Sequence, residues 1–231
     1  MPFATKKLNI EKAKNSLKQP VVLVACGSFS PVTYLHLRMF ELAKDRIEDS
    51  KRFELIGGYF SPVSDSYMKN GLALHTHRIK MCELAVEDSD WIMVDEWEGT
   101  HAEYVRTVKV LDYFQDCVNQ WVERESIGRN VRVILLAGGD LVESFGIPGL
   151  WADADLEKIM GNYGCLIVER TGVDLKGFLL EHDIAYKNRQ HIHNDISSTK
   201  IRLFIKRGLS IKYLLPEEVI RYIYDHNLYT E

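Results

Sequence analysis

The sequence lacks paired cysteines and long apolar runs. Its 231 residues include 4 cysteines, at positions 26, 82, 117 and 165, and no two of them form a Cys-x-x-Cys pair. Single cysteines among apolar neighbours exclude a disulfide framework and indicate buried thiols in a reducing compartment. No apolar run approaches the roughly 20 residues of a membrane-spanning helix, and residues 1–19 contain no signal-peptide core. We therefore expect an intracellular protein without a membrane partner, in the nucleus and/or the cytoplasm.

An excess of basic residues is also absent. Lys and Arg number 29 against 33 Asp and Glu, which gives a formal net charge of -4. This balance argues against nucleic acid as a partner. With 46% apolar residues the chain can bury a full core. Residues 1–19 are polar and lysine-rich, so we predict a flexible extension there, followed by a single domain over residues 20–231.

The usual phosphate-binding fingerprints are missing as well. No turn carries the three glycines of a dinucleotide site or the Gly-Lys-Ser/Thr ending of a P-loop. Instead, the apolar run from Val21 to Cys26 stops at Gly27 and is followed by a helical pattern that begins near His36. This arrangement predicts a buried strand, a glycine turn and a helix whose free N-H groups can bind phosphate. Many such turns bind nothing, so this stretch alone leaves a purely structural role open.

Strands and helices alternate along the rest of the chain. The alternation predicts an α/β fold, a Rossmann-like doubly wound parallel sheet with helices on both faces. The expected strands are residues 21–26, 53–60, 91–94, 131–137 and 165–168, and the expected helices are 37–48, 75–86, 102–123, 153–160 and one that begins at 197 or 198.

A second candidate phosphate site lies near the C-terminus. Consecutive hydroxyls at Ser197 and Ser198 predict a helix start, and Lys200 and Arg202 follow within one turn. We expect a second anion site there, facing away from the first. Two such sites suit a triphosphate. A further candidate phosphate ligand is Lys69, which lies in a loop of turn-forming residues after the second strand.

Several motifs resemble one enzyme family. Residues 27–36 match Gly-x-Phe-x-Pro-x-Thr-x-x-His, which is similar to the first signature of the nucleotidyltransferase superfamily. Residues 196–202 are similar to the Ile-Ser-Ser-Thr-x-x-Arg signature of the nicotinamide/nicotinic acid mononucleotide adenylyltransferases. The resemblance covers residues 21–229 and is strongest to the fungal branch. It implies a homo-oligomer that transfers the adenylyl group of ATP to nicotinamide mononucleotide (NMN) or nicotinate mononucleotide, giving NAD or deamido-NAD and pyrophosphate.

The resemblance also implies site residues. Catalysis falls to His36 and Arg202. Contacts with ATP are assigned to Gly27, Ser28, Phe29, His36, Lys69, Ser198, Thr199, Lys200, Ile201 and Arg202. Contacts with the mononucleotide are assigned to Tyr104, Thr107, Gly138, Asp140, Leu150, Trp151, Arg170 and Asn194. The segment before Asn194 is shorter than in the family, so its contacts stay unassigned.

The residue types suit phosphoryl chemistry without a protein nucleophile. The attacking 5'-phosphate is ionised near neutral pH because its second pKa is about 6, so the protein needs only to align two polyanions and stabilise their charge. We expect Mg²⁺ as cofactor, held mainly by phosphates and water, with no protein metal site. The flat cationic nicotinamide ring requires an aromatic face, for which Tyr104, Trp97 and Trp151 are candidates.

Two other hypotheses stay open. One is a relative of the class I aminoacyl-tRNA synthetases on the same scaffold. The other is a nucleotide-binding protein that acts as a chaperone or scaffold, either without turnover or in addition to it.

Overall fold

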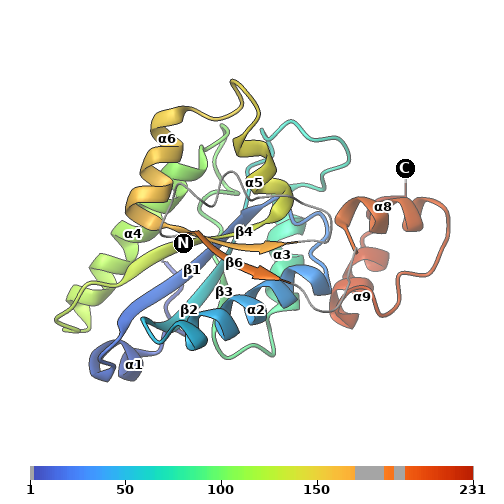
Figure 1. Cartoon of the computed structure of the whole chain (residues 1–231). Helices are drawn as coiled ribbons and strands as arrows, with labels where there is room; N and C mark the ends of the chain where they lie inside the picture. Colours follow the sequence, from blue (N-terminus) through green and yellow to red (C-terminus); the bar gives the residue numbers. More distant parts are fainter. Residues whose placement is uncertain (1–2, 170–184, 190–195, 231) are drawn as a thin grey trace.

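A six-stranded parallel sheet organises the protein (Figure 1). The structure is a computed structural model and describes residues 3–169, 185–189 and 196–230. The strand order is β3-β2-β1-β4-β5-β6, and every neighbouring pair is parallel. This order confirms the predicted doubly wound sheet, and its last strand was not predicted. The strands are β1 (Gln19–Gly27), β2 (Phe53–Pro62), β3 (Ile92–Val94), β4 (Arg132–Gly138), β5 (Cys165–Glu169) and β6 (Ala185–Arg189).

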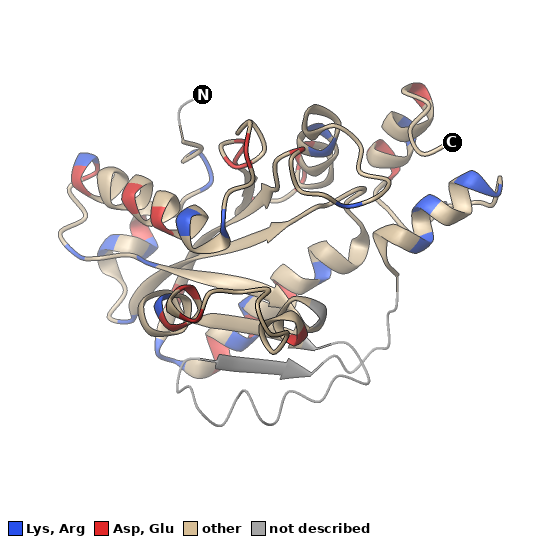
Figure 2. Ribbon diagram, turned by 90° about the horizontal axis from the view of Figure 1, so that it is seen from above, with Lys and Arg blue, Asp and Glu red and all other residues tan. Residues whose placement is uncertain are grey.

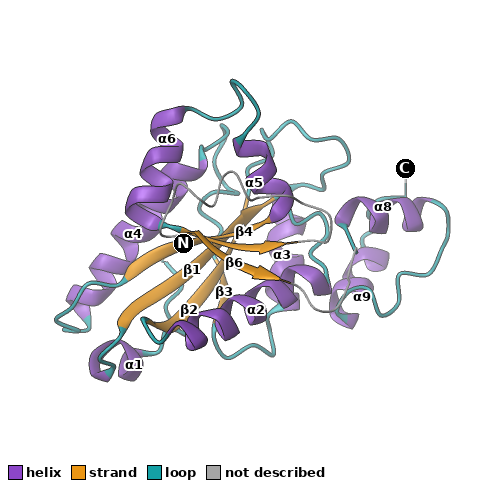
Figure 3. Cartoon of the chain, in the orientation of Figure 1, coloured by secondary structure: helices purple, strands orange, loops and turns teal. Residues whose placement is uncertain are grey.

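Helices cover both faces of the sheet, as Figure 3 shows. They are α1 (Ile10–Asn15), α2 (Tyr34–Ser50), α3 (His75–Ala85), α4 (Thr107–Arg124), α5 (Gly139–Phe145), α6 (Asp153–Lys158), the π-helical turn η1 (Ile159–Tyr163), α8 (Ser198–Lys206) and α9 (Glu217–Asp225). The sequence pattern missed α5 and α9, and it indicated only weak helicity in the segment that contains α1. It also placed the start of α4 at residue 102, whereas Arg106 is extended and the helix begins at Thr107.

The first strand shows why the sheet is covered on both sides. Val21, Leu23 and Ala25 belong to the core under α2, while Val22 and Val24 belong to the core under α4. Successive side chains of a strand point to opposite faces, so a strand buried on both faces must be apolar at every position. The continuous apolar run of the sequence is therefore explained by two cores.

The N-terminal segment is part of the second core, contrary to the expected flexible extension. Leu8 is 6% exposed and lies over Gly57, where an added Cβ would come within 2.5 Å of the leucine side chain. The β1–β2 register shifts between Val21 and Val22, and the carbonyl of Ile56 at this irregularity accepts the N-H of Asn9 at 2.9 Å. The N-terminal segment therefore covers the surface that the β1–β2 irregularity and the missing side chain of Gly57 leave open. The polar composition of the segment hid this attachment, because Leu8 and Ala13 are its buried apolar side chains, and Phe3, Ala4 and Ile10 pack beside them partly buried.

Replacing Leu8 tests this attachment. We expect Leu8→Ala to lower the free energy of unfolding by about 2–3 kcal/mol, because it opens a cavity over Gly57. Leu17→Ala is the matched control, since Leu17 is 102% exposed and a surface truncation changes stability by roughly 0.5 kcal/mol at most. Urea unfolding of both variants measures the difference. Equal stabilities for the two variants would mean that the segment is frayed after all.

Several outer helices carry both signs of charge, whereas α8 carries only Lys and Arg, as Figure 2 shows. Some of these charges pair within a helix, such as Lys80 with Glu83 and Arg221 with Glu218. In the described part of the chain, no helix combines the length and the hydrophobicity that crossing a membrane requires.

Candidate active site

The candidate site lies at the carboxyl ends of β1 and β4. These strands are neighbours at the centre of the sheet, where the chain order reverses, and doubly wound sheets bind ligands outside the strand ends at this point. A cavity of about 460 Å³ opens there. Its walls come from the turn after β1, the ends of β2 and β3, the start of α4 and the segment from α5 to α6; the lining residues are Cys26, Gly27, Ser28, Val63, Tyr67, Lys69, Glu98, Tyr104, Arg106, Thr107, Leu141, Ser144, Leu150, Trp151, Ala152 and Asp155.

The turn after β1 forms the first predicted phosphate corner. A Cβ on Gly27 would lie 2.9 Å from the ring of Phe29, so only glycine lets that ring pack against the strand end. Thr33 then caps α2 together with His36: the Thr33 N-H donates to His36 Nδ1 at 3.0 Å, and Thr33 Oγ1 lies 2.9 Å from the same atom. Because Nδ1 accepts the backbone N-H, the ring proton is assigned to Nε2. His36 therefore takes the place of Glu or Gln in a capping box and presents Nε2-H as its donor.

The start of α8 forms the second predicted corner, and it adjoins the first. Ser197 caps the helix as predicted, its Oγ accepting the Lys200 N-H at 3.2 Å. Ser198 Oγ donates to the carbonyl of Pro31 at 2.9 Å, and Arg202 Nη1 donates to the carbonyl of Ser30 at 2.8 Å. The expectation that the two corners face away from each other is therefore wrong. Both helix starts contact the same turn, so a single polyanion can meet both.

Arg202 is partly buried in this junction. Burial lowers the pKa of its guanidinium, and the nearby Tyr229 opposes that shift. The Tyr229 hydroxyl lies 2.9 Å from Ser30 Oγ, and burial raises its pKa to about 12. Tyr229 is therefore a neutral hydroxyl that fixes the Ser30 side chain beneath Arg202, which remains a cation.

The loop between β2 and α3 spans both parts of the site. Lys69, a candidate phosphate ligand from the sequence, lines the cavity. Two residues further on, Gly71 adopts φ +76, and a Cβ there would lie 3.1 Å from Arg202 Nε. The positive φ and the close approach both require glycine at this position. The loop thus brings Lys69 to the cavity while it rests on the arginine of the second corner.

Arg78 anchors this loop, and the sequence reasoning missed it. Its side chain is fully buried and donates to three carbonyls: Ala73 at 2.8 Å, Ser28 at 3.1 Å and Val63 at 2.6 Å. A fourth bond, at 2.9 Å, pairs it with Asp65 Oδ1. Burial by itself raises the pKa of Asp65, but the hydrogen bonds from His75 and Arg78 outweigh it and lower that pKa overall. One guanidinium therefore joins the phosphate turn, the end of β2 and both ends of the Lys69 loop.

Aromatic side chains form the outer wall of the cavity. The rings of Tyr67 and Tyr104 lie 5.7 Å apart at 30°, and Thr107 begins α4 beside them. Across the cavity, Trp151 Nε1 donates to Ser144 Oγ at 3.0 Å. Trp97, the third candidate for ring binding, is not part of this wall, because it stacks on Tyr113 at 4.1 Å and 5°. The structure thus brings Tyr104, Thr107 and Trp151 together, as the resemblance implied.

Glu98 is a buried carboxyl at the cavity that the sequence reasoning also missed. It is 2% exposed, and its Oε2 accepts the Ser61 hydroxyl at 2.5 Å. Burial raises the pKa of Glu98 to about 8, although the Ser61 bond and Arg78 oppose the shift. The Cys26 thiol beside it also has a raised pKa, through burial and then through Glu98. Near neutral pH the inner wall of the cavity is therefore uncharged, which suits a site for phosphorylated ligands.

This raised pKa predicts a pH-dependent stability. The native state holds the Glu98 proton more tightly than the unfolded chain, so the free energy of unfolding falls as pH rises from about 4.5 to about 8. Glu98→Gln keeps an acceptor for Ser61 and cannot ionise. We expect the stability of the variant relative to the unmodified protein to increase by up to about 4 kcal/mol as the pH rises from about 5 to about 9. Urea unfolding at both pH values checks this. Parallel pH profiles would show that Glu98 is ionised throughout.

The remaining predicted residues occupy varied positions. Ile201 is 1% exposed and its N-H bonds the Ser197 carbonyl, so it is a core residue with no group left to offer a nucleotide, contrary to its assignment. The Thr199 hydroxyl lies 3.4 Å from Arg202 Nη2. Gly138 ends β4, Asp140 falls within α5, and Leu150 is 59% exposed at the cavity. Arg170 and Asn194 lie outside the described residues.

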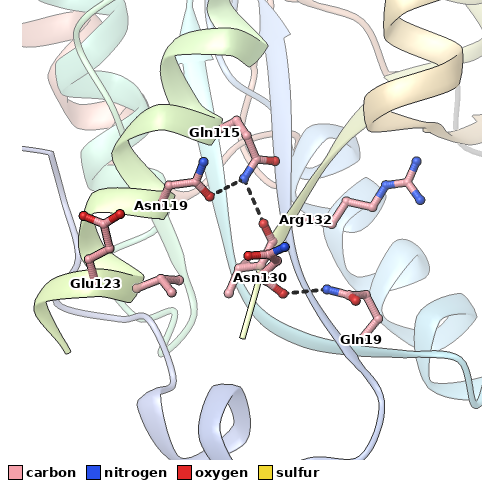
Figure 4. Close-up of a pocket in the computed structure, with 8 residues that line it drawn as sticks. Gln19, Gln115, Asn119, Glu123, Asn130 and Arg132 are labelled. Atoms are coloured by element: carbon pink, nitrogen blue, oxygen red, sulfur yellow. Dashed lines mark hydrogen bonds between the residues drawn. The ribbon is translucent and has the colours of Figure 1, made fainter. Parts of the chain in front are cut away.

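A second pocket lies at the opposite ends of the strands (Figure 4). Gln19 and Arg132, which begin β1 and β4, line it together with the amides of α4. Gln115 donates to Asn119 at 3.0 Å and to the carbonyl of Val131 at 2.8 Å. Gln19 donates to the carbonyl of Asn130, and Arg132 donates to the carbonyl of Tyr163, so these polar groups hold the strand starts to neighbouring backbone at the amino edge of the sheet.

Comparisons with known proteins agree with this geometry. The model of the cytidylyltransferase-like family matches residues 24–204, most of the chain. The chain therefore belongs to the cytidylyltransferase-like family. Within it, the chain is a member of the nicotinamide/nicotinic acid mononucleotide adenylyltransferases: it is 40% identical to adenylyltransferase 1 of Bos taurus over 94% of this chain and 91% of that protein.

Fungal relatives are more similar in sequence but longer. Adenylyltransferase 2 of Saccharomyces cerevisiae is 57% identical over 95% of this chain, which spans only 58% of that protein. Adenylyltransferase 1 of the same yeast is 59% identical over 93% of this chain and 56% of its own length. A solved structure of the nicotinic acid mononucleotide adenylyltransferase of Plasmodium falciparum, complexed with APC, superimposes with a TM-score of 0.62 over 90% of this chain and 96% of that chain, at 21% identity. That likeness establishes a shared fold.

Proposed function

We propose that this chain transfers the adenylyl group of ATP to NMN or nicotinate mononucleotide. The observation that carries the proposal is the contact of both helix starts with one turn, beside a cavity that has an aromatic wall. In this arrangement the helix starts would bind a triphosphate, and the aromatic wall of the cavity would bind a flat ring. Membership of the adenylyltransferase family, and the printed names of its members, support the same reaction.

The chain's own residues would align and neutralise the reactants. A 5'-phosphate oxygen of the mononucleotide attacks the α-phosphorus of ATP, the bond from that phosphorus to the bridging oxygen breaks, and pyrophosphate leaves. His36 Nε2-H, Arg202 and Lys69 are the donors that would stabilise charge on the phosphates, and the N-H groups at the starts of α2 and α8 add to them. No proton has to be removed from the attacking phosphate, because it is already ionised.

We propose that Mg²⁺ binds together with ATP, coordinated by its phosphates. Among the described residues, no group of three or more His, Cys, Asp and Glu side chains could hold a metal ion. Asp155 is paired with Arg106, and Glu98 is buried, so neither offers an open carboxylate. A hard cation held by phosphate oxygens and water fits such a cavity. When bound, it would supply charge neutralisation on the triphosphate.

A product assay tests the reaction. The chain is incubated with ATP, Mg²⁺ and either mononucleotide, and the products are separated by chromatography and identified by mass. We expect NAD or deamido-NAD and pyrophosphate in equal amounts. Hydrolysis of ATP to AMP without a dinucleotide, or no reaction with either mononucleotide, would contradict the proposal. Omitting Mg²⁺ in the presence of a chelator should reduce turnover strongly.

Assembly and location complete the proposal. We propose a homo-oligomer, and light scattering measures its mass; a monomer mass would contradict it. A nuclear or cytoplasmic location is tested by imaging the tagged protein.

A further inference from the structure

The cavity contains a cation that the proposed reaction does not use. Arg106 lines the cavity directly before Thr107, and its Nη1 lies 2.9 Å from Asp155 Oδ2. The arginine side chain is 56% exposed, whereas the aspartate is 14% exposed. The ion pair connects Arg106, which directly precedes α4, with Asp155, which lies in α6. It therefore links the Tyr104 side of the cavity to the Trp151 side.

The other charged residues that line the cavity lie away from its aromatic end or are buried. Lys69 belongs to the loop that rests on Arg202, at the phosphate end of the site. Glu98 is buried and bonded to Ser61. Among the residues known to line the cavity, Arg106 is thus the cation at its aromatic end, where a ring would lie between Tyr104 and Trp151.

The two mononucleotides differ in charge at this end. The ring of one carries a neutral carboxamide and the ring of the other a carboxylate. An amide needs only neutral donors and acceptors, whereas a desolvated carboxylate needs a cation. A guanidinium has five N-H donors, so Arg106 can keep its bond to Asp155 and still present further N-H groups to a ligand. Its pairing with Asp155 compensates its charge, so a neutral carboxamide meets no unpaired cation at this end of the cavity.

We propose that Arg106, held by Asp155, determines specificity by admitting mononucleotides whose ring carries a carboxylate. This inference rests on the proposed adenylyl transfer. It assigns opposite effects to the two members of one ion pair. Removing the cation disfavours the carboxylate substrate, whereas removing the aspartate frees the cation for it.

The test compares kcat/KM for both mononucleotides in matched variants. Arg106→Gln removes the charge, Arg106→Lys keeps it, and Asp155→Asn breaks the pair but keeps the arginine. Arg124→Gln is the control, because Arg124 is an exposed arginine at the far end of α4. We expect the ratio of nicotinate to nicotinamide substrate to fall about tenfold in Arg106→Gln, to fall less in Arg106→Lys, and to rise about threefold in Asp155→Asn. Arg124→Gln should leave the ratio unchanged.

Several outcomes would overturn this assignment. Equal losses for both substrates in Arg106→Gln and Asp155→Asn would show that the pair only closes the cavity. An unchanged ratio in all variants would show that Arg106 does not contact the ring substituent. Inactivity of the unmodified chain on both substrates would instead contradict the proposed function itself, so the two failures are distinguishable.

Discussion

Replacing His36 with alanine is expected to lower kcat/KM for adenylyl transfer by about 10²–10³-fold, because one donor aimed at developing phosphate charge is lost. The substitution also removes the acceptor of the Thr33 N-H, so a loss of about 1 kcal/mol in stability accompanies it. Steady-state kinetics and urea unfolding measure the two effects separately.

A glutamine at position 36 separates catalysis from capping. Thr33-x-x-Gln is a standard capping box, so His36→Gln is expected to restore the stability of α2. Its side chain does not place a donor where Nε2-H lies, so turnover should stay low. His226→Gln is the control, because His226 bonds the Tyr222 carbonyl of α9 and takes no part in the Thr33 cap. Recovery of turnover in His36→Gln would show that His36 acts only as a helix cap and not in catalysis.

Replacing Arg78 with methionine is expected to lower the free energy of unfolding by about 3–5 kcal/mol, because it leaves buried partners unpaired. Three carbonyls and Asp65 lose the guanidinium that joins them. Differential unfolding in urea, with Lys80→Met as an exposed control on the same helix, measures the loss. The control should change stability by roughly 0.5 kcal/mol at most.

A milder substitution at the same position, Arg78→Lys, tests the effect on the site in a protein that still folds. An ammonium group would keep the charge near Asp65 but could not reach all three carbonyls. We expect Arg78→Lys to fold and to raise KM for ATP more than it lowers kcat, since the Lys69 loop and the Ser28 turn are less firmly held. If Arg78→Lys lowered the stability but left the kinetics unchanged, Arg78 would have a structural role only.

The sequence predicted the sheet and the turn-and-helix starts at both candidate phosphate corners for physical reasons. A strand covered on both faces must be apolar throughout, and free helix N-H groups attract hydroxyl caps, so β1 and Ser197 were recognisable from their residue types. The family resemblance assigned Tyr104, Thr107 and Trp151 to one ligand, and the structure places all three at one cavity. The relation between the two corners was wrong because it depends on how α8 packs against the Ser30–Pro31 turn, a contact between distant segments.

Arg78 and Glu98 were missed for a related reason. Each looks like a surface charge until its burial is known. One signal was available for Arg78: it shares a helical stripe with Cys82 and Ala85, and a charge on an apolar stripe indicates a buried, bonded role. Glu98 follows the end of β3, where sheets of this kind bind ligands. No pattern in the sequence indicated that Leu8 covers Gly57, since the fit depends on the β1–β2 irregularity.

If the starts of α2 and α8 hold one ATP molecule between them, as we propose, His36 and Arg202 should be coupled in a double-mutant cycle on nucleotide binding. A non-hydrolysable ATP analogue is titrated by calorimetry into the unmodified chain, His36→Gln, Arg202→Met and the double variant. We expect each single variant to bind more weakly and the two effects to be coupled by at least about 0.5 kcal/mol, because both side chains meet the same triphosphate. Strictly additive effects, or full affinity in either single variant, would contradict the account.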